Sequence, residues 1–281
     1  MYWQNKGRNV MIIHSATVIY FSPTGTTKKI VDSVLEGTEL AISEIIDLSL
    51  PEGRKADKPC INTDIVFIGV PVYETGIPKI LIPFLTSLKG NGRPVVLLAV
   101  YGNMSEGTTL NELYSITHHV GFNVVSAASF IGEHSFSTEE TPIAKGRPDR
   151  ADLLKAKEFG KNIMKKVQNI SILSDVSLEI PQGKTPLIAK ILPENSAKLF
   201  AKAPIVDRSK CNQCGKCVNL CPVSAIDKDT LAINQTQCLR CFCCVKRCPK
   251  KARKITYQPK LIVSKILTLK SKVKKEPNIY L

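Results

Sequence analysis

The sequence lacks the features of several large protein classes. No apolar run approaches the roughly 18 residues that a membrane-spanning helix needs, and no secretory signal opens the chain. No Ser/His/Asp or Cys/His constellation offers a nucleophile for hydrolysis. These absences predict a soluble, cytoplasmic protein whose chemistry is not hydrolytic.

Acidic residues are scarce in the C-terminal part of the chain. Residues 171 to 281 contain 21 Lys and Arg against 7 Asp and Glu, whereas residues 1 to 170 contain 18 against 17. The net charge of +15 therefore belongs almost entirely to the C-terminal part. Such a surface attracts an acidic protein partner, an anionic membrane surface or nucleic acid.

Histidine is absent after His134, but cysteine is abundant there, in two runs of identical spacing. Both runs have the pattern C-x2-C-x2-C-x3-C-P, and they end at Pro222 and Pro249. The spacing is that of bacterial two-cluster ferredoxins, in which the fourth cysteine of each run binds the other cluster. The pattern predicts one [4Fe-4S] cluster on Cys211, Cys214, Cys217 and Cys248 and a second on Cys238, Cys241, Cys244 and Cys221.

Two other uses of these cysteines are weighed against the clusters. Structural zinc usually takes paired C-x2-C elements separated by a gap, or histidine partners, and disulfides suit small secreted domains. Neither accounts for the duplicated run. Cys60 and Cys243 stand outside the pattern. We expect Cys60 to be an ordinary thiol and Cys243 to fill space as a small hydrophobe, with tuning of the second cluster's surroundings as the alternative for Cys243.

The N-terminal part alternates apolar strands with helical patterns, which predicts a parallel α/β sheet with right-handed crossovers. The expected strands are residues 16–21, 44–48, 65–70, 94–100 and 124–131, and the expected helices are residues 78–88, 109–120 and 150–167. Five strands favour a doubly wound sheet of the flavodoxin order. Asp149 is the expected N-cap of the last helix.

Three loops follow strands of this sheet, at the edge where doubly wound proteins bind ligands. The first is rich in hydroxyls, begins a helix and suits a phosphate monoester. The other two place a tyrosine beside turn residues, which suits a flat ring. The candidate residues are Ser22, Thr24, Gly25, Thr26 and Thr27 in the first loop, Pro71, Val72, Tyr73 and Gly76 in the second, and Tyr101, Gly102 and Asn103 in the third.

We expect other residues to be structural. Helix-terminal roles are favoured for His118 and His119, and a capping or surface role for His134. The expected organisation is a disordered extension at 1–14, a sheet domain at 15–170, a linker at 171–205, a small cysteine domain at 206–256 and a basic tail at 257–281. We expect the tail to pack on the chain's own surface through Leu261, Ile262, Ile266 and Leu269.

Together, the hydroxyl loop and the cysteine runs resemble the flavodoxin-ferredoxin fusion family of anaerobic prokaryotes. The resemblance covers nearly the whole chain. It implies FMN, with its phosphate at Ser22 to Thr27 and its ring between the loops of Tyr73 and Tyr101. It also implies a small α+β domain that holds the two clusters.

Our leading hypothesis is electron transfer between the two clusters and FMN, which couples one-electron and two-electron partners. An FMN-dependent reductase of a small acceptor is the alternative, and a basic zinc protein that binds nucleic acid is the third. We expect a redox protein partner, with an acidic surface as one option, no nucleic acid and no membrane span. A homodimer is left open.

Overall fold

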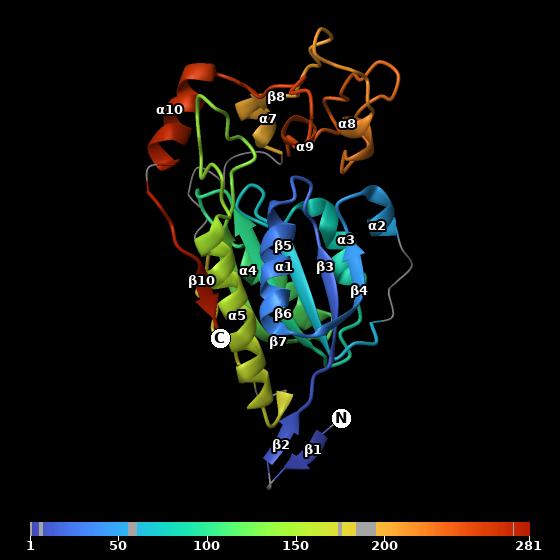
Figure 1. Cartoon of the computed structure of the whole chain (residues 1–281), viewed down its shortest axis with the longest axis vertical. Helices are drawn as coiled ribbons and strands as arrows, with labels where there is room; N and C mark the ends of the chain where they lie inside the picture. The colour runs from blue at the N-terminus through green and yellow to red at the C-terminus, as the bar shows by residue number, and fades with distance from the viewer. Residues whose placement is uncertain (1, 6–7, 56–60, 174–175, 184–194, 272) are drawn as a thin grey trace.

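Figure 1 shows a computed structural model of the chain with two parts stacked end to end. The structure describes residues 2–5, 8–55, 61–173, 176–183, 195–271 and 273–281. Cys60 and residues 174–175 and 184–194 of the predicted linker thus lie outside the described residues. Within the described residues, no helix is long and apolar enough to cross a membrane.

The N-terminal part is a parallel sheet covered by helices on both faces (Figure 1). The chain order is β3 (Ser15–Tyr20), α1 (Thr26–Thr38), β4 (Ala41–Asp47), α2 (Pro51–Lys55), β5 (Ile65–Pro71), η1 (Lys79–Leu81), α3 (Ile82–Ser87), β6 (Pro94–Tyr101), α4 (Thr109–His119), β7 (Asn123–Ile131) and α5 (Arg150–Gln168). The parallel strands lie in the order β4-β3-β5-β6-β7. In chain order this is 2-1-3-4-5, so the flavodoxin-like fold is confirmed.

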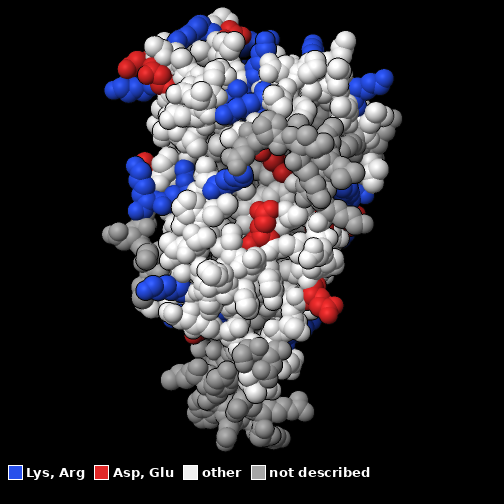
Figure 2. Space-filling model, turned by 180° about the vertical axis from the view of Figure 1, so that it is seen from behind, with Lys and Arg blue, Asp and Glu red and all other residues white. Residues whose placement is uncertain are grey.

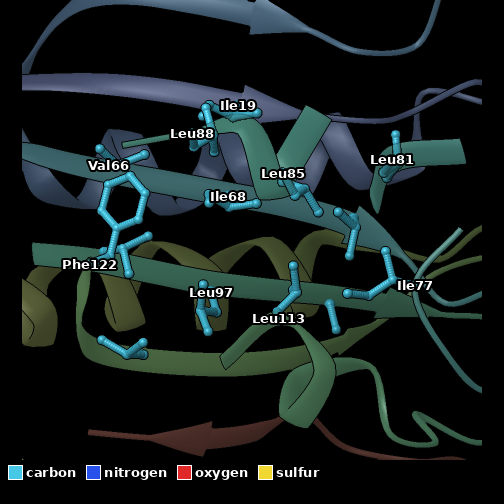
Figure 3. Close-up of a cluster of buried hydrophobic side chains, with 14 of the residues drawn as sticks. Ile19, Val66, Ile68, Ile77, Leu81, Leu85, Leu88, Leu97, Leu113 and Phe122 are labelled. Atoms are coloured by element: carbon cyan, nitrogen blue, oxygen red, sulfur yellow. The ribbon is translucent and has the colours of Figure 1, made fainter. Parts of the chain in front are cut away.

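Two apolar cores lie on opposite faces of this sheet. Figure 3 shows the first, where Ile68 and Leu97 of the sheet face Leu85 of α3 and Leu113 of α4. In the second core, Phe67 and Leu98 point the other way, onto α1 and α5. Alternate residues of β5 and β6 thus serve both cores, which explains why these strands are continuous apolar runs.

Helix α5 begins as the sequence predicts. The Asp149 side chain accepts hydrogen bonds from the amides of Ala151 and Asp152, and the Asp152 carboxylate accepts one from the amide of Asp149, which forms a capping box. Arg147 pairs with the buried Asp152 carboxylate and also donates to the carbonyl of Lys275 in the tail. The helix start is therefore tied to the end of the chain.

The ends of the chain form strands outside the five predicted ones. Within the extension at 1–14, β1 (Tyr2–Asn5) and β2 (Arg8–Met11) pair as an antiparallel hairpin. The C-terminal strand β10 (Asn278–Tyr280) pairs antiparallel with β7, and the sheet has six strands instead of the predicted five. The tail fills an edge that β7 would otherwise leave unpaired.

The tail helix α10 (Lys260–Ser271) packs on the chain, but through other residues than the expected ones. Val263 and Leu267 are buried, whereas the four residues predicted to pack are exposed. Those exposed residues are Leu261, Ile262, Ile266 and Leu269. The sequence offers apolar residues on both faces of this helix, and only the surface beneath it selects between them.

The C-terminal part contains α7 (Ala197–Phe200), β8 (Ala201–Lys202), α8 (Lys216–Asn219), α9 (Cys243–Lys246) and β9 (Thr256–Tyr257). Two antiparallel bridges, Val206 with Arg253 and Ile226 with Ile233, join its two halves. Val206 and Ile233 are 27 residues apart, as are Ile226 and Arg253, so the bridges repeat with the period of the cysteine runs. This part lies over one end of the sheet domain (Figure 1).

Candidate functional site

The eight cysteines of the two runs line two separate hollows. Those of the first hollow are Cys211, Cys214, Cys217 and Cys248, and those of the second are Cys221, Cys238, Cys241 and Cys244. Each hollow thus receives three cysteines from one run and the fourth from the other. These are the same two sets that the spacing predicts, and four thiols around an apolar hollow are the donor set of an iron-sulfur cluster.

Backbone amides donate hydrogen bonds to the fourth cysteine of each run, which lines the hollow of the other run. The amide of Ala225 donates to the sulfur of Cys221 at 3.3 Å, and the amide of Ala252 donates to that of Cys248 at the same distance. Hydrogen bonds to cluster sulfurs are one means by which a protein sets the reduction potential. Among the described residues, no group of three or more His, Cys, Asp or Glu could hold a single metal ion.

The predicted phosphate loop forms a compact turn ahead of α1. The amide of Gly25 donates to the carbonyl of Ser22 at 3.0 Å, and the Ser22 hydroxyl accepts from the amide of Lys28 at 3.0 Å. In the described part of the chain, the amides of Thr26 and Thr27 have no protein acceptor. These first-turn amides, together with the helix dipole, suit an anion.

A pocket lies beside this loop, at the carboxyl edge of the sheet. We call it the edge pocket, and it is lined by Ser22, Pro23, Thr24, Thr26, Thr27, Pro71, Val72, Tyr73, Val100, Tyr101, Gly102, Gly132, Glu133, His134 and Ser135. All three predicted loops contribute to it. A fourth segment, residues 132–135 after β7, also lines it and is absent from the predicted site.

The loop after β5 is fixed by a tight turn. Tyr73 and Gly76 exchange two backbone hydrogen bonds of 3.0 and 2.9 Å, and the residues between them have positive φ. The Tyr73 ring packs edge-on against Phe21, with centroids 6.1 Å apart. Burial, followed by the neighbouring Cys241 and Cys243 thiols, raises the pKa of Tyr73 well above its usual value. The tyrosine therefore stands between the edge pocket and the second hollow.

His134 forms part of the pocket wall. Its Nδ1 accepts a hydrogen bond from the amide of Phe136 at 3.0 Å, so a neutral ring carries its proton on Nε2. Burial, assisted by the charge of Lys246, lowers the pKa of His134 to about 4. The imidazole is neutral at pH 7 and can donate a hydrogen bond from Nε2. The expected capping role fits Nδ1, which accepts a hydrogen bond from a backbone amide, but it does not account for Nε2.

Three predicted residues, Gly25, Gly76 and Asn103, do not line the pocket. The Gly76 α-carbon faces the carboxylate of Glu112, which a Cβ would meet at 2.7 Å. Asn103 is buried, and its amide donates to the carbonyl of Val273 at 2.8 Å while its oxygen accepts from the amide of Lys275 at 3.3 Å. Asn103 therefore holds the tail, a role that its position after β6 does not reveal.

A hydrogen bond of Cys243 joins the lining of the second hollow to that of the edge pocket. This buried cysteine lines the second hollow, and its thiol donates to the carbonyl of Pro23 at 2.8 Å. Pro23 in turn lines the edge pocket. Burial raises the pKa of Cys243 to about 11, so the thiol stays protonated and can donate. Cys243 fills space as predicted, and it also joins the two sites.

Basic side chains surround the cysteine part on the face shown in Figure 2, where Lys and Arg gather at the end that holds this part. Several acidic groups face the junction itself. Glu133 pairs with Lys246 at 2.6 Å, which lowers the pKa of that carboxyl against the raising effect of its burial. Glu74 accepts hydrogen bonds from the amides of Asn195 and Ala197 at the start of α7.

Comparison with known proteins gives one family match. Residues 203–249 match the family model of the 4Fe-4S dicluster domain. No curated protein matches this sequence at a significant level.

Solved structures resemble the N-terminal half. A flavodoxin from the domain Archaea shares 17% identity, covers 54% of this chain and 98% of its own, and has a TM-score of 0.39. The flavodoxin of Streptococcus pneumoniae TIGR4 shares 15%, with coverages of 54% and 99% and a TM-score of 0.41. An FMN-dependent NADH-azoreductase from Bacillus anthracis, solved with FMN, shares 12%, with coverages of 56% and 100% and a TM-score of 0.37.

The strand order of the sheet and the family match of residues 203–249 thus apply to different parts of the chain. The chain joins a domain of flavodoxin-like fold to a 4Fe-4S dicluster segment, the organisation that its resemblance to flavodoxin-ferredoxin fusion proteins predicts.

Proposed function

We propose that this protein transfers electrons between FMN in the edge pocket and two [4Fe-4S] clusters in the cysteine hollows. The observation that carries the proposal is the contact between the two sites, where Cys243 lines the second hollow and its thiol donates a hydrogen bond to the carbonyl of Pro23 in the edge pocket. Bound FMN accepts two electrons, and each cluster exchanges one. The protein then exchanges electrons between one-electron and two-electron partners.

Residues of the chain would bind the flavin and keep water from the cluster. The amides of Thr26 and Thr27 would bind the phosphate, and the loops of Tyr73 and Tyr101 would flank the ring. The apolar lining of the second hollow, which includes Ile226, would keep water from the cluster. Neutral His134 would donate a hydrogen bond without adding a charge.

The order of the sites follows from their positions. Both hollows are lined by residues of the C-terminal part, but the second adjoins the edge pocket through Cys243 and Tyr73. Among the described residues, no hydrogen bond joins the lining of the first hollow to that of the edge pocket. Electrons from an external donor would enter at the cluster of Cys211, Cys214, Cys217 and Cys248 and reach FMN through the other cluster. The exposed Cys214 marks the outer side.

The test is the kinetic order of flavin reduction in anaerobic protein that contains FMN and about eight iron atoms. After rapid reduction of the clusters, we expect FMN to be reduced at a rate that does not depend on protein concentration. A rate that rises with concentration would show transfer between molecules and contradict the proposal. Steady turnover of a small acceptor, faster than with free FMN, would instead favour the reductase hypothesis.

A further inference from the structure

The two cysteine runs differ around their short helices. In the first copy, α8 and its flanks carry Gly215, Lys216, Asn219 and Leu220. In the second copy, the matching positions 27 residues later carry Phe242, Cys243, Lys246 and Arg247. The cysteines around them are the same in both copies. The difference therefore serves something other than cluster ligation.

The substituted residues of the second copy contact the flavodoxin-like domain. Phe242 packs edge-on against Phe136 with centroids 4.9 Å apart, and the Cys243 thiol donates to Pro23. Lys246 binds Glu133 at 2.6 Å. At the matching position in the first copy, a Cβ on Gly215 would meet nothing within 4 Å. Helix α9 is thus the surface by which the cluster domain docks on the sheet domain.

Arg247 reaches the predicted phosphate loop from this helix. Its Nη1 lies 3.4 Å, and its Cζ 4.0 Å, from the position that a Cβ on Gly25 would occupy. Gly25 has φ of 88° and immediately precedes the first turn of α1. Among the described residues, no hydrogen bond or salt bridge engages the Arg247 guanidinium. A cation without a carboxylate partner therefore stands over the loop.

The loop itself supplies no such cation. Residues 22–27 contain neither lysine nor arginine. Lys28, the next residue, is paired with Asp32 at 2.7 Å. A phosphate monoester carries close to two negative charges at neutral pH, and a guanidinium binds its oxygens through two parallel hydrogen bonds.

We propose that Arg247 of the cluster domain binds the phosphate of the flavin held by the other domain, and that it makes the protein prefer FMN to riboflavin. The inference rests on the proposed function, since it requires a flavin in the edge pocket. It adds that the flavin phosphate lies between two domains. By linkage, FMN binding and domain docking then strengthen each other.

The experiment measures the dissociation constants of FMN and riboflavin by quenching of flavin fluorescence, in flavin-free protein with both clusters loaded. We compare the wild type with Arg247→Gln. Loss of a charge-assisted hydrogen bond at an exposed side chain should weaken FMN binding about tenfold. Riboflavin has no phosphate, so its affinity should change less than about twofold.

Two further variants serve as controls. Lys216→Gln removes one positive charge beside a cluster cysteine at the matching helix of the first copy, and it should change neither affinity. Arg247→Lys keeps the charge but cannot form the two parallel hydrogen bonds of a guanidinium, and we expect the affinity for FMN to fall about threefold. Iron content and visible circular dichroism report whether each variant loads its clusters.

The outcomes separate this inference from the proposed function. If the wild type binds FMN but Arg247→Gln binds it equally well, or loses FMN and riboflavin affinity alike, Arg247 is not a phosphate ligand. If Arg247→Gln does not load its clusters, the lysine variant decides, and wild-type FMN affinity in that variant would overturn the inference. A wild type that binds neither flavin would overturn the proposed function as well.

Discussion

At the scale of single residues, adjacent cysteines have different surroundings. Cys244 lies in the set of four that lines the second hollow, while Cys243 beside it points its thiol at Pro23. Cys221 belongs to the first run but lines the second hollow. Cys243 also lines the second hollow, so the hydrogen bond of its thiol to Pro23, and not its place beside the hollow, sets it apart from Cys244.

This assignment predicts the iron content of two variants. In Cys221→Ala we expect loss of the cluster in the second hollow, which leaves about four iron atoms per chain, because three thiols remain there. In Cys243→Ala we expect about eight, because no ligand is removed. Iron and acid-labile sulfide analysis of anaerobic protein measures both. Four irons in Cys243→Ala and eight in Cys221→Ala would show that Cys243, and not Cys221, binds the cluster in the second hollow.

At the scale of elements, the tail belongs to the flavodoxin-like domain. Strand β10 extends the sheet, and Lys275 donates from its Nζ to the carbonyl of Met104 at 2.6 Å. Asn103 binds the backbone of the tail at both Val273 and Lys275. One buried side chain thus supplies two hydrogen bonds that fix the approach to β10.

Replacing this side chain should destabilise the fold. Asn103→Ala leaves two backbone groups without partners and puts alanine at a φ of 61°, so we expect a loss of about 2–3 kcal/mol in the free energy of unfolding. Asn103→Gly tolerates the backbone conformation and should show mainly the hydrogen-bond loss. Far-UV circular dichroism during urea unfolding measures both variants. Wild-type stability in Asn103→Ala would mean that the tail is held by other contacts.

The sequence predicts elements whose signal is local. Residues 94–100 form an unbroken apolar run because a central parallel strand is buried on both faces, and the structure places β6 there. The cysteine spacing is equally local. Strand β10 has only three residues, of which two are exposed, and it is defined by the free edge of β7, some 150 residues away. No local pattern could reveal that pairing.

The candidate site shows the same limit. The hydroxyl loop, Tyr73 and Tyr101 are recognisable because each follows an apolar strand. Phe242, Lys246 and Arg247 are residues of a short cysteine-rich repeat, and their contacts depend on how two domains meet. The mismatch between the two repeat copies was the available signal, and it pointed to Cys243 without indicating what the helix faces.

At the scale of the whole molecule, an apolar cluster holds the two domains together. Phe136 follows β7 and packs against Phe242, and its ring lies parallel to that of Tyr257 with centroids 6.5 Å apart. The Tyr257 hydroxyl donates to the Phe136 carbonyl at 2.6 Å. Val263 and Leu267 of α10 belong to the same cluster. Three distant segments of the chain therefore meet beside the edge pocket.

This cluster should control the rate of electron transfer within the chain. Phe136→Ala removes a buried ring from the junction and should weaken domain docking by about 3 kcal/mol, as other large-to-small core changes do. Because transfer depends on contact between the edge pocket and the second hollow, we expect slower reduction of FMN by the clusters, with iron content unchanged. Stopped-flow absorbance under anaerobic conditions measures the rate.

Tyr114→Ala is the matched control for this change. Tyr114 is also an aromatic residue, but it lies on α4, where it stacks on His118 with centroids 5.9 Å apart and takes no part in the junction. It should leave the transfer rate unchanged even if it lowers stability. Equal slowing in both variants would attribute the effect to general destabilisation. An unchanged rate in Phe136→Ala would mean that the polar contacts of Cys243 and Lys246 suffice to keep the two sites together.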